Sequence, residues 1–172
     1  MRELTVFFCR HGIAVEREAF EGSDGDRPLT AKGEKKTQQI AQRLLDLGIE
    51  AELLLSSPLV RARQTAEILL KVGLAPDLMI SELLAPSGSL QEWLNWLSHW
   101  CQEHEGPLLA VGHEPNLSHW AELLICGKAL GHIQLKKAGL IGLKVPTTDP
   151  LGNSHLFWLT PPKFLLNSSG IA

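Results

Sequence analysis

A short apolar run that ends in a cation, an imidazole and a glycine constrains this chain more than any other feature. The run Thr-Val-Phe-Phe-Cys at positions 5–9 leads directly into Arg10, His11 and Gly12. It is too short for a helix but typical of a strand buried on both faces of a parallel sheet. Open sheets of this kind bind ligands beyond the carboxyl ends of their strands. Arg10 and His11 are therefore predicted at a site, although the tripeptide alone also fits a basic strand end with a solvated histidine.

Two later stretches repeat this arrangement. A second strand is predicted over residues 52–56, directly before Ser57-Pro58 and Arg61, and a fourth over residues 107–112, directly before His113. Ser57-Pro58 is predicted to start a helix, which places Arg61 in its first turn. Free N–H groups and the helix dipole favour anions there, so a cation at this position indicates an anionic ligand.

Taken together, these motifs resemble the histidine phosphatase superfamily, the phosphoglycerate-mutase-like enzymes, over about residues 4 to 118. The matching segments are Arg10-His11-Gly12, Ser57 to Ala66 (SPLVRARQTA) and Gly112-His113. Arg27-Pro28-Leu29-Thr30 with Gly33 also resembles the short SixA-type phosphohistidine phosphatases of that superfamily. The resemblance implies an α/β fold with an open, mainly parallel sheet, helices on both of its faces and an antiparallel edge strand.

The resemblance also implies roles for individual residues. His11 is the expected nucleophile, an imidazole that attacks phosphorus and holds the phosphoryl group until water removes it. Arg10 and Arg61 are expected to bind phosphate, because guanidinium groups grip its oxygens bidentately. His113 is expected to contact a phosphoryl oxygen from the other side. Arg63, two positions after Arg61 and four before Glu67, is predicted to be a surface ion-pair partner.

The sequence supports two interpretations of Glu82. In the larger phosphatases and mutases a glutamate at about this place serves as general acid and base, but the rest of their local motif is missing here. Glu82 is therefore either a catalytic acid or a surface carboxylate near the end of a third strand predicted over residues 77–83. Only 24 residues separate Glu82 from Pro107, which leaves room for one helix and no lid, so a shallow and open pocket is predicted.

The remaining elements follow from periodicity and from capping residues. The rest of the chain is predicted as a polar rim loop (13–27), helices (30–48, 57–73, 89 to about 104, and 115–127), a strand pair (138–145 and 155–160) and an irregular tail after Pro161. Trp93, Trp96 and Trp100 form a stripe on the third helix, which is more typical of a core edge than of a docking surface.

Composition limits the remaining functions. A chain of 172 residues, 44% hydrophobic and with a net charge of −3, is predicted to form one domain over residues 1–172, without a general attraction to nucleic acid or anionic membranes. Cys9, Cys101 and Cys126 are far apart and predict reduced thiols. No signal peptide or apolar membrane span is evident, which predicts a cytoplasmic protein. No metal site is predicted, since the histidines lack clustered carboxylates, and no cofactor is implied.

These observations favour a phosphatase that hydrolyses protein phosphohistidine through an intermediate on His11. The phosphorus–nitrogen bond becomes labile when the ring is protonated, so this substrate demands less of an enzymic acid than an alkyl phosphate does. The first alternative is a phosphatase of small phosphoesters, which would need Glu82 as its acid. The second is a non-catalytic phospho-binding module, which would not require His11 in addition to two arginines. The expected partner is a phosphorylated protein or a small phosphoester.

Overall fold

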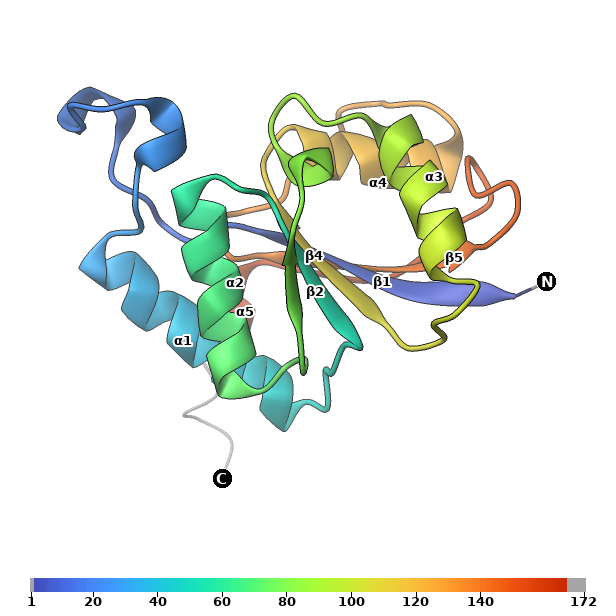
Figure 1. Ribbon diagram of the computed structural model, residues 1–172, viewed down its shortest axis with the longest axis horizontal. Coiled ribbons are helices and arrows are strands. Elements are labelled where there is room, and N and C mark those ends of the chain that lie inside the picture. Colours follow the sequence, from blue (N-terminus) through green and yellow to red (C-terminus); the bar gives the residue numbers. More distant parts are fainter. Residues whose placement is uncertain (1, 167–172) are drawn as a thin grey trace.

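The structure is a computed structural model that describes residues 2–166. A six-stranded sheet lies between two layers of helices (Figure 1). The strands are β1 (Glu3–Arg10), β2 (Leu53–Ser56), β3 (Leu78–Ile80), β4 (Leu108–Gly112), β5 (Leu140–Pro146) and β6 (His155–Thr160). The α-helices are α1 (Ala31–Asp46), α2 (Val60–Val72), α3 (Leu90–Trp100), α4 (Asn116–Cys126) and α5 (Pro162–Leu166). Three 3₁₀ turns, η1 (Arg17–Ala19), η2 (Asp24–Asp26) and η3 (Glu82–Leu84), complete the elements.

The sheet has the predicted open, mainly parallel form. Its strand order is β3-β2-β4-β1-β5-β6, in which the first four strands run parallel and β5 and β6 form an antiparallel hairpin at one edge. The register places Arg10 beside Gly112 and Ser56 beside Val111. The carboxyl ends of β1, β2 and β4 therefore finish side by side, and the three sequence motifs follow from these ends.

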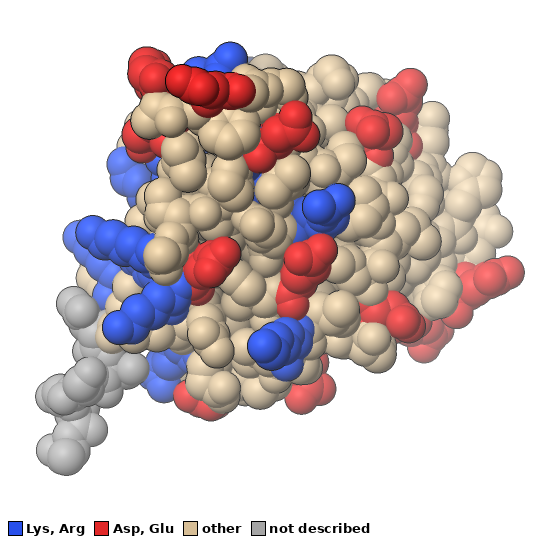
Figure 2. All heavy atoms as spheres, turned by 60° about the vertical axis from the view of Figure 1, so that its left-hand side comes forward, with Lys and Arg blue, Asp and Glu red and all other residues tan. Residues whose placement is uncertain are grey.

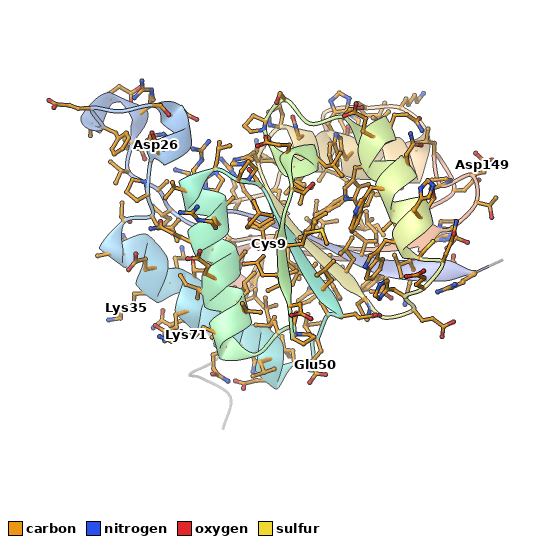
Figure 3. All side chains as sticks on the ribbon, viewed as in Figure 1. Cys9, Asp26, Lys35, Glu50, Lys71 and Asp149 are labelled. Atoms are coloured by element: carbon orange, nitrogen blue, oxygen red, sulfur yellow. The ribbon has the colours of Figure 1, made fainter. Side chains whose placement is uncertain are left out.

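Alternating side chains of the central strands build a core on each face of the sheet. Val6 and Phe8 of β1 belong to the core under α3 and α4, whereas Phe7 and Cys9 belong to the core under α1, α2 and α5. Cys9 accordingly lies in the middle of the molecule, while the labelled charged residues lie at its periphery (Figure 3). Burial on both faces confirms that the apolar run of β1 is an inner strand.

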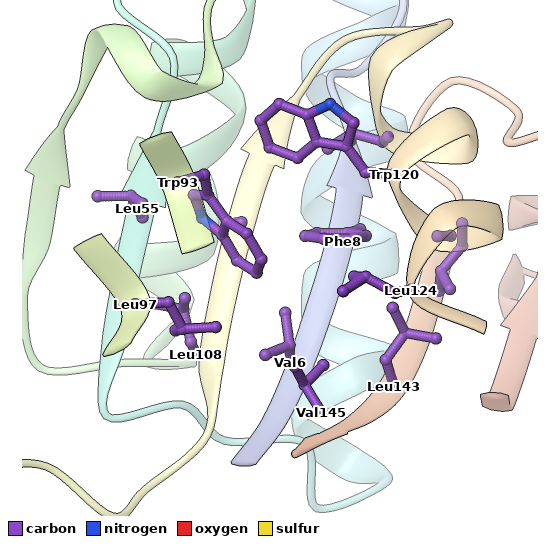
Figure 4. Close-up of a cluster of buried hydrophobic side chains, with 14 of the residues drawn as sticks. Val6, Phe8, Leu55, Trp93, Leu97, Leu108, Trp120, Leu124, Leu143 and Val145 are labelled. Atoms are coloured by element: carbon purple, nitrogen blue, oxygen red, sulfur yellow. The ribbon is translucent and has the colours of Figure 1, made fainter. Parts of the chain in front are cut away.

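The tryptophan stripe of α3 belongs to the core and its edge. Trp93 is fully buried, with ring centroids 5.4 Å from Phe8 and 5.8 Å from Trp120 (Figure 4). Trp96 and Trp100 are half-buried, pack against this cluster and stack on each other with centroids 6.0 Å apart. The prediction that favoured the core is confirmed for Trp93.

Several predicted boundaries are wrong. Helix α2 starts at Val60 instead of Ser57-Pro58, α3 ends at Trp100, and the third strand is limited to Leu78–Ile80. His104 lies beyond the end of α3, and its ring forms a hydrogen bond with Glu52. Residues 162–166 form α5 instead of an irregular tail because Leu165 is buried in the core under α1. Residues 167–172 lie outside the described part of the chain.

The structure bears on two further predictions, one about the cysteines and one about membrane-spanning segments. Cys9, Cys101 and Cys126 are all unpaired, as predicted. Between residues 2 and 166, none of the helices combines the length and apolar character that crossing a membrane requires.

Candidate active site

His11 follows the end of β1, and only 6% of it is exposed. Its Nδ1 lies 2.7 Å from the carbonyl oxygen of Gly12. A carbonyl oxygen can only accept, so Nδ1 carries the proton and donates it. In the neutral ring Nε2 is therefore unprotonated. Its lone pair accepts a hydrogen bond from Nε of Arg61 at 3.3 Å. Nε2 is thus the unprotonated ring nitrogen of His11.

The surroundings of the two site histidines keep both rings neutral. Burial lowers the pKa of His11 to about 3, and the nearby charges of Arg61 and Arg10 act in the same direction. Burial also lowers the pKa of His113 to about 4, again reinforced by Arg61. The lone pair of His11 therefore stays available at neutral and mildly acidic pH.

These low pKa values predict a loss of stability in acid. Unfolded histidine binds a proton with a pKa of about 6.5, whereas His11 and His113 in the folded protein do so only near 3 and 4. Below pH 6.5 the unfolded state binds more protons, so the free energy of unfolding should fall by roughly 1.4 kcal/mol per pH unit for each histidine until the folded pKa is reached. Urea unfolding between pH 7.5 and 4.5 measures this slope. The His11→Asn/His113→Asn variant should show a shallower slope, and an unchanged slope would contradict the prediction.

Arg61 lies in the first turn of α2, as predicted, and is only 5% exposed. In addition to its contact with His11, it donates from Nη1 to the backbone oxygen of Asp24 at 2.8 Å and from Nη2 to the Asp24 carboxylate at 3.0 Å. The other carboxylate oxygen of Asp24 accepts from Nε of Arg27 at 2.8 Å. Asp24 therefore bridges two guanidinium groups beside His11. Although its partial burial has the opposite effect, the bond from Arg27 and the charge of Arg61 lower its pKa, so Asp24 is ionised.

His113 follows the end of β4, and its ring centroid lies 5.2 Å from that of His11. Its Nε2 is 2.7 Å from Oγ of Ser57, which also accepts a hydrogen bond from the backbone N–H of Leu59. When the Ser57 hydroxyl donates to Nε2, the proton of His113 is on Nδ1. Among the described residues this buried Nδ1 has no hydrogen-bond partner. Such an atom indicates a ligand, since buried donors are almost always paired.

Arg10 is held by the segment between α4 and β5. Its Nη1 donates to the carbonyl oxygen of Leu135 at 3.0 Å. The backbone N–H of Leu135 is bound by Oγ of Ser118, which in turn donates to the carboxylate of Glu114 at 2.6 Å. The buried Nε of Arg10 has no partner among the described residues. Arg10 thus offers a second unsatisfied donor at the same site.

Close contacts at two glycines fix the segment that follows His11. A Cβ atom on Gly12 would lie 2.4 Å from Oγ1 of Thr37, and one on Gly33 would lie 2.0 Å from the carbonyl oxygen of Ile13. The backbone therefore requires glycine at position 33, and a side chain at position 12 would displace that of Thr37. The N–H of Gly12 also donates to Oγ1 of Thr65 on α2 at 2.9 Å. Thr30 caps α1 through the N–H of Gly33, as predicted.

These side chains surround a hollow of about 380 Å³. Its lining includes four of the predicted site residues (Arg10, His11, Arg61 and His113) and much of the predicted rim loop (Ala14, Glu16, Arg17, Glu18, Asp24 and Arg27). Glu82 is exposed in η3 and does not belong to this lining, which is taken from residues 2–166. Arg63 points away to an ion pair with Glu67 at 3.5 Å, as predicted. No three His, Cys, Asp or Glu side chains of the described chain are grouped in a way that could hold a metal ion.

Sequence reasoning missed Ser57 and Asp24 as parts of the site. The sequence predicts Ser57 only as part of a helix start, whereas its hydroxyl contacts the ring of His113. Asp24 gave no signal of its own, since it is one of several acids in a polar loop. Its partner Arg27 did give one, because it begins the Arg-Pro-Leu-Thr segment.

Comparisons of the sequence and the fold with known proteins point to one superfamily. Residues 6–83 match the sequence model of the histidine phosphatase superfamily, branch 1. An uncharacterized protein of Picosynechococcus sp. is 47% identical over 165 residues, which cover 95% of this chain and 99% of that protein. The serine/threonine-protein phosphatase Pgam5 of Drosophila ananassae is 45% identical over 66 residues, which cover 38% of this chain but only 22% of its own length. The structure of the protein histidine phosphatase SixA complexed with tungstate is 25% identical and has a TM-score of 0.82, covering 94% of this chain and 99% of that one.

Proposed function

This chain belongs to the histidine phosphatase superfamily, and from that premise we propose that it is a single-domain cytoplasmic phosphatase which hydrolyses protein phosphohistidine. The observation that carries the proposal is the neutral His11, whose unprotonated Nε2 accepts from Arg61 in a hollow that Arg10 and His113 also line. The reaction has two steps, transfer of the phosphoryl group to His11 and its release to water.

In the first step, Nε2 of His11 attacks phosphorus and the bond from phosphorus to the leaving nitrogen breaks. The leaving imidazole keeps the bonding electron pair, and a proton already on its other nitrogen leaves it neutral. Arg61 exchanges its contacts with Nε2 and Asp24 for phosphoryl oxygens. Nε of Arg10 and Nδ1 of His113 supply further donors, since neither has a partner in the described protein. Fixed donors of this kind stabilise the charge that spreads over the oxygens during transfer.

In the second step, a water oxygen attacks phosphorus and the bond to Nε2 breaks. Because Nδ1 of His11 retains its proton through the bond to Gly12, the phosphorylated ring is cationic, which is the labile form of a phosphohistidine. Inorganic phosphate leaves, one proton of the water passes to phosphate or solvent, and His11 returns to its neutral state.

The acids of the hollow favour a substrate that needs little protonation from the enzyme. Asp24 is ionised between Arg27 and Arg61, and the Glu114 carboxylate is bound by the N–H and hydroxyl of Ser118. Glu16, a third acid of the lining, pairs with Lys137. Three of the four acids that line the hollow are therefore already engaged by other groups, and the fourth is Glu18. An alkyl phosphate needs a proton on its leaving group, because its alkoxide is a poor leaving group, whereas protonated phosphohistidine does not. The likeness to the protein histidine phosphatase SixA supports the same substrate.

Glu82→Gln separates this proposal from its small-phosphoester alternative. We expect kcat/KM on a phosphohistidine protein to change by less than about threefold, because Glu82 is outside the lining of the hollow. The measurement compares a phosphohistidine protein, an aryl phosphate and an alkyl phosphate at one pH and salt concentration, with wild type as the reference. Phosphohistidine should be the best of the three for wild type.

Equal losses of about a hundredfold on all substrates would make Glu82 an obligatory acid and favour the small-phosphoester function. Wild-type protein that binds phosphate but turns over none of the substrates would favour a non-catalytic binding module.

A further inference from the structure

A groove outside the catalytic hollow carries an unusual concentration of lysine. It has a volume of about 560 Å³ and is lined by Arg10, Ile13, Lys36, Lys136, Lys137, Pro161, Pro162 and Lys163. These residues come from the end of β1, from α1, from the segment before β5 and from the start of α5. No acidic residue belongs to this lining, although the whole chain has a net charge of −3. The groove is therefore positively charged, although the chain as a whole is negatively charged.

The lysines of the groove are mostly free of ion pairs. Within residues 2–166, Lys36, Lys136 and Lys163 have no carboxylate within 4.0 Å, while Lys137 pairs with the exposed Glu16 at 3.6 Å. Lys163 instead lies over the ring of Phe164, which is 67% exposed. On the face shown in Figure 2, several Lys and Arg side chains lie along the left-hand edge. A surface with unpaired cations, a few apolar side chains and an exposed aromatic ring is suited to contact with an acidic protein.

The groove and the catalytic hollow adjoin each other. Arg10 and Lys137 line both, and Ile13 of the groove is two residues after His11. If the phosphorylated side chain of a protein substrate reaches His11, the substrate residues next to that side chain would therefore lie along the lysines of the groove. The small number of cations and the apolar residues Ile13, Pro161 and Pro162 favour a protein over nucleic acid, which requires a longer basic track.

We propose that this groove docks acidic residues next to the phosphorylated side chain of a protein substrate, and so selects acidic phosphoproteins. The proposal rests on the proposed function, since it assumes that the substrate is a protein. The lysines contribute mainly to encounter and binding, as charges at the rim of an interface do.

The test uses two synthetic phosphohistidine peptides, one flanked by aspartate and glutamate and the other by serine and glycine. Wild type at low salt should have a kcat/KM about tenfold higher on the acidic peptide, through a lower KM, and 0.5 M NaCl should remove the preference. Lys136→Glu/Lys163→Glu should abolish or reverse the preference while changing kcat on the neutral peptide less than twofold. Lys71→Glu/Lys128→Glu is the matched control, because it changes the charge equally at exposed lysines outside the groove and should retain the preference.

The outcomes separate the groove from the proposed function. Equal kcat/KM values on the two peptides, or an equal effect of the two double variants, would overturn docking at the groove while leaving the phosphohistidine activity intact. Failure to hydrolyse either peptide would refute the proposed function itself. Binding of a single-stranded oligonucleotide more tightly than the acidic peptide, with loss of that binding in Lys136→Glu/Lys163→Glu, would show that the groove serves nucleic acid.

Discussion

His11→Ala is expected to lower kcat on a phosphohistidine protein by about 10⁴-fold or more. The variant removes Nε2, the atom of this residue that is expected to accept the phosphoryl group. Nε2 is unprotonated because the proton of the ring is on Nδ1, which donates it to the carbonyl oxygen of Gly12. Losing a nucleophile removes the covalent route entirely, so the remaining rate comes only from positioning and from the donors around it. Steady-state release of inorganic phosphate measures the loss.

Two further variants make this result interpretable. His11→Asn keeps a polar side chain at the buried position and should be equally inactive, which excludes a simple loss of packing if circular dichroism and thermal unfolding show a folded protein. His99→Ala removes an exposed histidine of α3 and should retain wild-type turnover. Substantial turnover in folded His11→Ala would mean that His11 is not the nucleophile.

Arg61→Lys is expected to lower kcat/KM by roughly 10²- to 10³-fold, as removal of a fixed donor to a developing oxyanion commonly does. Arg61 uses Nε, Nη1 and Nη2 at once, to His11 and Asp24. Lysine retains the charge but is a compact ammonium group that cannot reproduce this planar fork. Phosphate release on wild type and variant, with stability measured in parallel, gives the comparison.

Arg63→Lys provides the matched control two residues along the same helix. Arg63 is exposed and pairs with Glu67, and such surface pairs contribute little, so its kcat/KM should stay within about twofold of wild type. Similar losses in both variants would contradict the assignment of Arg61 to the phosphoryl group.

Much of the fold was predictable because the local signals agree with the tertiary structure. The apolar run before Arg10 predicts an inner strand, and residues 6–9 are buried on both faces of the sheet. Thr30 and Gly73 mark helix ends by capping and by a left-handed conformation. The antiparallel hairpin β5–β6 was also recognisable from its two closely spaced strands.

The site was predictable only where its residues follow strand ends. Parallel pairing of β1, β2 and β4 brings Arg10, His11 and His113 together with the start of α2, and this follows from the sheet alone. Asp24 reaches Arg61 only through the path of the loop around η2, and Ser57 reaches His113 only through the turn before α2. Both depend on backbone turns that leave no periodic signal in the sequence. The sequence also left the place of Glu82 open, and the structure puts this residue in η3, beyond β3 and outside the lining of the hollow.

The most direct test of the account is to locate the phosphoryl group during turnover. A ³²P-labelled phosphohistidine protein is mixed with a stoichiometric amount of enzyme, quenched rapidly in alkali, and the enzyme is digested and mapped. The account predicts transient, acid-labile and base-stable label on the peptide that contains His11, attached to Nε2 because Nδ1 is held by the Gly12 carbonyl, and no label in His11→Asn. Label on another residue, label on Nδ1, or phosphate release with no labelled enzyme at any time would contradict it.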